Sequence, residues 1–165
     1  MNKQLKFLII SVVAVIAASV IAGLAFSGGA SDSNGTPKLV LTETDYDFGT
    51  ISMANGLARH EFKIKNEGNA DLKLSNISTS CMCTTAVLIQ NGKKSPTFGM
   101  HNNPTIWSEK IKPGEEAVLE VIFDPLAHGP DATGPVSRAI TMYSNEGGNG
   151  QNTRTVLMIS GNVVK

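Results

Sequence analysis

The sequence lacks an excess of either charge: 14 Lys and Arg residues balance 14 Asp and Glu residues, so the formal net charge is zero. A chain without a basic field has no electrostatic attraction to nucleic acid, and one without an acidic excess has no solvating tail. Aromatic residues are few, but six Phe, two Tyr and one Trp suffice for a single core. The composition therefore predicts one domain with appendages and no nucleic-acid partner.

The sequence motifs of common enzyme classes are missing as well. The chain has no Gly-x-Ser-x-Gly, no phosphate-binding loop and no His-Glu-x-x-His. A Cys–His pair for nucleophilic catalysis remains, formed by Cys81 or Cys83 with His101 or His128, but no third group that would orient it is identifiable. We therefore predict that the protein is not an enzyme.

One long hydrophobic run is present, in residues 7–26, and it contains no charge. Twenty helical residues span about 30 Å, the thickness of the hydrocarbon core of a membrane. Lys3 and Lys6 precede the run and Asp32 follows it, which predicts a single-pass anchor with a cytoplasmic N-terminus and an extracytoplasmic body. The length favours this anchor. The alternative is a cleaved signal peptide, because the small residues at 28–30 form an acceptable cleavage site. In that case the mature protein is secreted or periplasmic.

The rest of the chain predicts an all-β domain. We assign residues 1–30 to the signal anchor or signal peptide, 31–38 to a flexible linker, and 39–165 to the folded domain. Short segments of alternating polar and apolar residues, separated by Gly, Pro and Asn, predict a seven-stranded immunoglobulin-like β-sandwich. The predicted strands are 38–51, 58–65, 71–75, 84–90, 117–123, 138–143 and 155–159. The alternation places Phe62, Leu72, Leu74, Leu119, Val121 and Phe123 in the core.

The two cysteines, Cys81 and Cys83, lie two residues apart in the stretch Thr79–Thr85. If this stretch is extended, both side chains share one face. Two residues of strand span roughly 6.6 Å, near the upper limit for a disulfide, so a bond between them would be strained. Three interpretations stay open: two parallel thiols that bind a soft metal ion, a strained redox pair, or two small side chains buried in the core.

The order of short motifs along the domain resembles a known family, the bacterial exported immunoglobulin-like domains of unknown function, which are related to Hydin-type Ig-like modules. The motifs are DFGTI (47–51), SCMCT (80–84), PGE (113–115), FDP (123–125) and YSN (143–145). The resemblance covers the region from Leu39 to Val164, which is a specific signal. It implies a seven-stranded sandwich outside the cytoplasm and implies no activity.

Two features depart from that family. Met82 stands between the cysteines where glycine is usual, and residues 90–111 form an insertion. Thiolate, thioether and imidazole are the ligands that Cu(I) prefers, and loops cluster at the ends of a sandwich. The candidate metal ligands are therefore Cys81, Cys83, Met100, His101 and His128, with copper(I) as the expected ion.

Three functions from different classes follow. Our main prediction is a non-catalytic, extracytoplasmic, membrane-tethered Ig-like module that binds or scaffolds an unknown extracytoplasmic protein. The alternative is a soft-metal (copper) binding protein that uses Cys81, Cys83 and the Met and His residues of the loops. A further alternative is a thiol redox protein that uses the same two cysteines.

Overall fold

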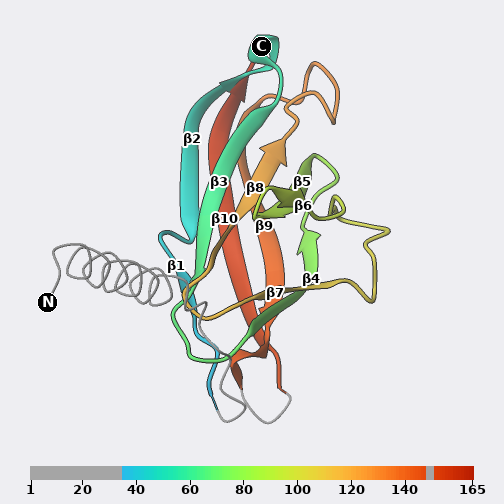
Figure 1. The fold of residues 1–165 in the computed structure, drawn as a ribbon. Coiled ribbons are helices and arrows are strands. Elements are labelled where there is room, and N and C mark those ends of the chain that lie inside the picture. Colours follow the sequence, from blue (N-terminus) through green and yellow to red (C-terminus); the bar gives the residue numbers. More distant parts are fainter. Residues whose placement is uncertain (1–34, 148–150) are drawn as a thin grey trace, which may run out of the picture. The chain divides into compact units, whose positions relative to one another are not determined.

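The structure is a computed structural model, and it describes residues 35–147 and 151–165. The predicted anchor or signal peptide (1–30) and the first part of the predicted linker lie outside the described residues. Within the described part, no helix has the length and apolar composition that crossing a membrane needs. That part contains ten strands in two sheets and two short 3-10 helices, η1 (Met53–Asn55) and η2 (Asn145–Gly147) (Figure 1).

The first sheet has the strand order β1-β3-β8-β5-β6, and all of its pairs are antiparallel. Alternation explains why β3 covers the core: Phe62 and Ile64 are fully buried, whereas Glu61 and Lys63 on the other face are exposed. The strands are β1 (Leu39–Leu41), β3 (Ala58–Asn66), β5 (Thr84–Gln90), β6 (Lys93–Lys94) and β8 (Glu116–Phe123).

The second sheet has the order β2-β10-β9-β4-β7. Its β2–β10 pair is parallel, and both strands run side by side along the sandwich (Figure 1). The strands are β2 (Asp45–Ser52), β4 (Leu72–Thr79), β7 (Ser108–Ile111), β9 (Gly134–Ser144) and β10 (Thr153–Val164). The predicted single extended segment 38–51 is therefore divided, because β1 joins the first sheet and β2 joins the second.

The core between the two sheets confirms the predicted alternation. All six side chains predicted to be buried are buried: Phe62, Leu72, Leu74, Leu119, Val121 and Phe123. The predicted number of seven strands is wrong for the described residues. Segment 38–51 forms two strands, and the predicted insertion 90–111 contains β6 and β7. The insertion also fills the core, because Phe98 is buried, bridges to Ala86 and packs against Trp107 with ring centroids 4.6 Å apart.

The side chain of Asn66, the last residue of β3, connects the turn after β3 to Lys38 before β1 and to Ile111 at the end of β7. Its Nδ2 donates to the carbonyl oxygens of Ala70 and Ile111, both at 2.8 Å. Its Oδ1 accepts from the backbone N–H of Gly68 at 2.9 Å and of Lys38 at 3.3 Å. A fully buried amide is stable only when its polar atoms have such partners, so Asn66 fixes this end of the sandwich.

The last residues of the predicted linker are bound to the same turn. The N–H of Asn69 donates to the Thr36 carbonyl at 3.1 Å, and the N–H of Glu67 donates to the Lys38 carbonyl at 2.9 Å. Gly68 permits this close approach, because a Cβ at that position would lie 2.3 Å from the Thr36 oxygen. Segment 36–38 therefore belongs to the folded domain.

Candidate metal centre

Cys81 and Cys83 lie in the turn that crosses from β4 in one sheet to β5 in the other. The extended conformation considered from the sequence is wrong for this stretch: the Thr84 N–H donates to the Cys81 carbonyl at 3.1 Å and closes a tight turn. Met82 occupies the tip of the turn and is 68% exposed, so it does not pack into the core. Although the backbone is not extended, the turn still brings the two sulfur atoms together.

Hydrogen bonds on both sides fix the cysteine turn. The Thr79 hydroxyl lies 3.0 Å from the Cys81 carbonyl oxygen and 2.8 Å from the Thr84 carbonyl oxygen. The Ser80 N–H donates to the Ala139 carbonyl of β9, and the Ala139 N–H donates to Ser80 Oγ, both at 2.9 Å. The turn is therefore pre-formed and attached to β9.

His128 reaches the cysteines from the loop that follows β8. The Asp124 N–H donates to the Cys83 carbonyl at 2.8 Å, and the Asp124 carboxylate accepts from the Leu126 N–H at 2.8 Å. A further turn, in which the Gly129 N–H donates to the Leu126 carbonyl at 2.9 Å, follows directly. These turns place His128 Nε2 3.2 Å from Cys81 Sγ.

Arg138 in β9 completes the site, and the sequence interpretation missed it. Its Nε donates to Cys83 Sγ at 3.1 Å, and its Nη1 donates to the Ser137 carbonyl at 2.8 Å. A signal was present in the sequence. Arg138 alternates with Ile140 and Met142, so the three side chains lie on the same face of the strand, and Ile140 and Met142 are fully buried. A charged side chain on the apolar face of a strand requires a partner, and here that partner is a sulfur atom.

The two sulfur atoms and one ring nitrogen of His128 all lie within 4.8 Å of one another. Cys83 is 2% exposed, Cys81 is half-buried and His128 is exposed, so the cluster extends from the core to the surface. A hollow of about 360 Å³ lies beside it, lined in part by His128, Arg138 and the apolar side chains of Phe123 and Val136. The hollow therefore gives access to the His128 side of the cluster, and neither cysteine lines it.

The environment separates the two thiols in acidity. Burial raises the pKa of Cys81, but hydrogen bonds with Cys83 and His128 and the positive charge of Arg138 outweigh it and lower the pKa to about 7. Burial raises the pKa of Cys83, and its hydrogen bond to Cys81 acts in the same direction against the opposing contacts of Arg138 and Thr84. Cys81 is therefore the thiol that ionises first.

The remaining predicted ligands, Met100 and His101, lie on the inserted loop. This loop does reach the end of β4, because the Thr79 N–H donates to the Gly99 carbonyl at 3.1 Å. Met100 is 45% exposed, His101 is exposed, and His101 is not part of the cluster of donor atoms. The described residues thus bring together three of the five predicted ligands, and a role for Met100 stays a prediction.

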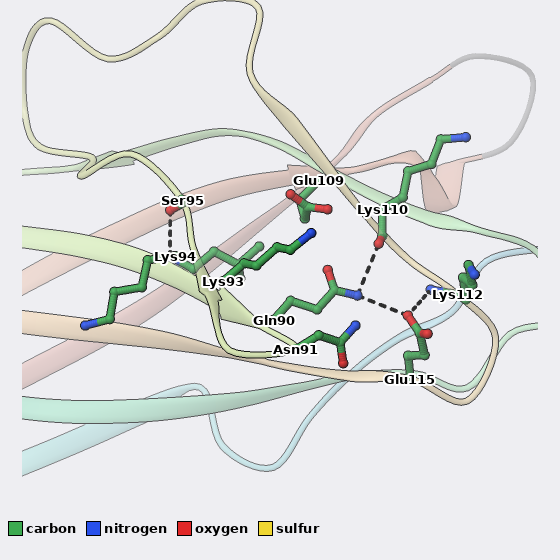
Figure 2. Close-up of a pocket in the computed structure, with 10 residues that line it drawn as sticks. Gln90, Asn91, Lys93, Lys94, Ser95, Glu109, Lys110, Lys112 and Glu115 are labelled. Atoms are coloured by element: carbon green, nitrogen blue, oxygen red, sulfur yellow. Dashed lines mark hydrogen bonds between the residues drawn. The ribbon is translucent and has the colours of Figure 1, made fainter.

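A second hollow, of about 230 Å³, lies near the other end of β5. Figure 2 shows Gln90 extending between β7 and the turn before β8, where its Nε2 donates to the Lys110 carbonyl at 3.2 Å and to the Glu115 carboxylate at 3.1 Å. The same carboxylate accepts from the Lys112 N–H at 3.2 Å. The hydrogen bonds among these polar groups join the two sheets. We therefore assign the residues around this hollow a structural role.

Comparison with known proteins gives the fold and a family match to part of the chain. Residues 39–96 match the protein-family model described as a protein of unknown function, DUF1573. This match includes both cysteines but ends before His128 and Arg138. No curated protein matches the chain.

The solved structures that are similar to the domain include two whose likeness is informative about the fold. A protein of unknown function from Porphyromonas gingivalis W83 is 18% identical over 83% of this chain, with a TM-score of 0.54, and this chain covers 50% of that protein's length. The seventh PapD-like domain of human CEP192 is 11% identical, with a TM-score of 0.50, over 79% of this chain and 87% of that one. The fold is an Ig-like, PapD-like sandwich. At these identities the likeness shows the fold alone, and function depends on the site.

Proposed function

We propose that the protein is a non-catalytic, extracytoplasmic Ig-like binding module that binds one Cu(I) ion through Cys81, Cys83 and His128. The observation that carries this proposal is the convergence of two sulfur atoms and one imidazole nitrogen within 4.8 Å. These three donors come from two separate loops, and backbone hydrogen bonds hold both loops in place. Such a pre-formed set of donors needs little reorganisation to bind an ion.

The chemistry of the donors favours a soft ion. Thiolates select Cu(I), whereas carboxylates and carbonyls suit hard cations, and the site offers two sulfur atoms. Structural zinc sites usually have four protein ligands, but this cluster supplies three. Cu(I) accepts a lower coordination number, so three donors satisfy it. In the bound state both thiols are deprotonated and the imidazole is neutral, so binding releases protons.

The cellular setting of the proposal comes from the sequence. The uncharged run at residues 7–26, flanked by Lys3 and Lys6, supports a membrane tether with the domain outside the cytoplasm. The motif order supports an exported, Hydin-like Ig module. Sandwich domains present loops and strand edges to partners, so we propose that an extracytoplasmic protein docks on this module.

Titration of the reduced 165-residue chain with Cu(I), against a chromophoric chelator under anaerobic conditions, tests the proposal. We expect one equivalent to bind. Cys81→Ser and Cys83→Ser should each lower the affinity by more than about 100-fold, because the loss of outer-sphere contacts alone lowers metal affinity by about 10–100-fold. His128→Ala should lower it by at least about tenfold.

A matched control is available in His101→Ala, which removes an exposed histidine outside the cluster and should leave the affinity unchanged. Met100→Leu tests the predicted thioether ligand, and a weaker affinity would add it to the site. Full Cu(I) affinity in the double variant Cys81→Ser/Cys83→Ser would remove the thiolates from the site and refute the proposal.

A second candidate function, thiol–disulfide exchange, is favoured by the lowered pKa of Cys81. In that reaction the Cys81 thiolate attacks a disulfide of a partner protein and releases one thiolate. Cys83 then attacks Cys81 Sγ, which forms the Cys81–Cys83 disulfide and releases the reduced partner. Equilibration with glutathione buffers tests this candidate, and a chain that stays fully reduced in oxidising buffer would exclude it.

A further inference from the structure

The guanidinium of Arg138 is the one positive charge in direct contact with the cysteine sulfur atoms among the described residues, since its Nε lies 3.1 Å from Cys83 Sγ. Arginine does not lose its proton in proteins. The charge is therefore permanent. Its side chain is held at a second point by the Ser137 carbonyl, so it has a defined position in the site.

This fixed charge has a consequence for any ion that the cysteines bind. Two thiolates carry two negative charges, and Arg138 supplies one positive charge. A monovalent ion makes the total zero, whereas a divalent ion leaves one uncompensated positive charge. Because Cys83 is buried, such an imbalance is poorly screened by water and disfavours the divalent ion.

We propose that Arg138 is the residue that sets the metal specificity of this site, because its permanent charge favours a monovalent soft ion over a divalent one. This inference rests on the proposed function. The two ions between which Arg138 discriminates are Cu(I) and Zn²⁺. Arg138 does not act as a ligand. It acts through Cys83, whose sulfur it contacts, and through the charge balance of the whole cluster.

The hydrogen bond contributes in the same direction as the charge. The Arg138 Nε–H uses one lone pair of Cys83 Sγ, so this sulfur has less electron density to donate to a metal ion. The positive end of this N–H dipole also repels a divalent ion about twice as strongly as a monovalent ion in the same place, because the Coulomb energy is proportional to the charge. Removal of Arg138 should therefore strengthen Zn²⁺ binding relative to Cu(I) binding.

Affinities of the reduced 165-residue chain for Cu(I) and for Zn²⁺, measured separately by chelator competition, test the inference. Arg138→Gln should lower the ratio of Cu(I) affinity to Zn²⁺ affinity by at least about tenfold, because a unit charge in contact with one of the two sulfur atoms is removed. Arg138→Lys keeps the charge and should retain most of the ratio. If Arg138→Gln does not fold, Arg138→Met provides the same comparison with an uncharged side chain of similar length.

The matched control is Arg154→Gln. Arg154 lies on the neighbouring strand β10, opposite Tyr143 and towards the other end of β9 from Arg138, and its Nη2 donates to Thr141 Oγ1 at 3.3 Å. This variant removes the same charge away from the site and should leave the ratio unchanged. An equal change in the ratio for Arg154→Gln would show a general charge effect and overturn the inference.

The outcomes separate the two claims. A wild-type chain that binds no Cu(I) refutes the proposed function and with it the role of Arg138. A wild-type chain that binds Cu(I), together with a folded Arg138→Gln variant of unchanged ratio, refutes the role of Arg138 alone. A lower ratio in Arg138→Gln with a retained ratio in Arg138→Lys supports the charge as the cause.

Discussion

Cys81 is the thiol whose reactivity the structure predicts most sharply. Contacts with Cys83, His128 and Arg138 lower its pKa to about 7 despite partial burial. An ordinary cysteine has a pKa of about 8.5 and is only about 3% ionised at pH 7. Cys81 should be about half ionised at the same pH. Because the pKa is lowered, the Cys81 thiolate persists at neutral pH and is lost as the pH falls below 7.

Alkylation rates measure this difference, because the thiolate is the reactive form. Brief exposure of the reduced, metal-free chain to iodoacetamide between about pH 5 and pH 9, followed by peptide mass spectrometry, gives a rate for each cysteine. We expect a midpoint near pH 7 for Cys81, well below the value of about 8.5 for a free thiol. Cys83 should react more slowly at every pH, because it is buried and its pKa is raised.

Two variants make this prediction decisive. His128→Ala removes one of the contacts that lower the pKa, so the Cys81 midpoint should move to higher pH. Cys81→Ser leaves Cys83 alone and should show a chain that resists alkylation. A Cys81 midpoint at or above about 8.5, or faster modification of Cys83 than of Cys81, would refute the geometry of this site.

Three further predictions concern the scaffold and the N-terminus. Asn66→Ala removes four hydrogen bonds of a buried amide and should lower the free energy of unfolding, measured in urea, by about 3 kcal/mol. The control Asn162→Ala, at an exposed position, should change it by less than about 0.5 kcal/mol. Phe98→Ala should cost about 3–5 kcal/mol in the same assay, and Ile106→Ala, at a side chain that is 98% exposed, almost nothing. An equal loss for both would contradict the packing of the inserted loop. The mature chain should retain residues 1–30, and sequencing of its N-terminus would reveal cleavage if the signal-peptide alternative is correct.

Strand alternation made most of the sandwich predictable. The apolar positions of β3, β4 and β8 repeat with a period of two, so the core residues Phe62, Leu74 and Leu119 were correct from the sequence alone. The inserted region was harder, because β6 has two residues and β7 has four. Strands that short have no measurable period, and Phe98 is an isolated aromatic residue whose burial depends on a long-range bridge.

The site was partly predictable for a different reason. Cys81, Cys83 and His128 were named because their chemistry is distinctive, although the cysteine stretch was expected to be extended and is a turn. Arg138 was missed because its place on the buried face of a strand does not reveal its partner, a residue 55 positions earlier. That contact arises only when β9 pairs with β4 and carries the arginine to the cysteine turn.

The most direct test of the central claim is X-ray absorption spectroscopy of the copper-loaded chain at the copper edge. The proposed function predicts one Cu(I) ion with two sulfur neighbours and one nitrogen neighbour, from Cys81, Cys83 and His128, the three residues whose donor atoms lie together. The nitrogen contribution should disappear in His128→Ala and persist in His101→Ala. A first coordination shell without sulfur, or no copper retained after removal of excess ion, would contradict the account.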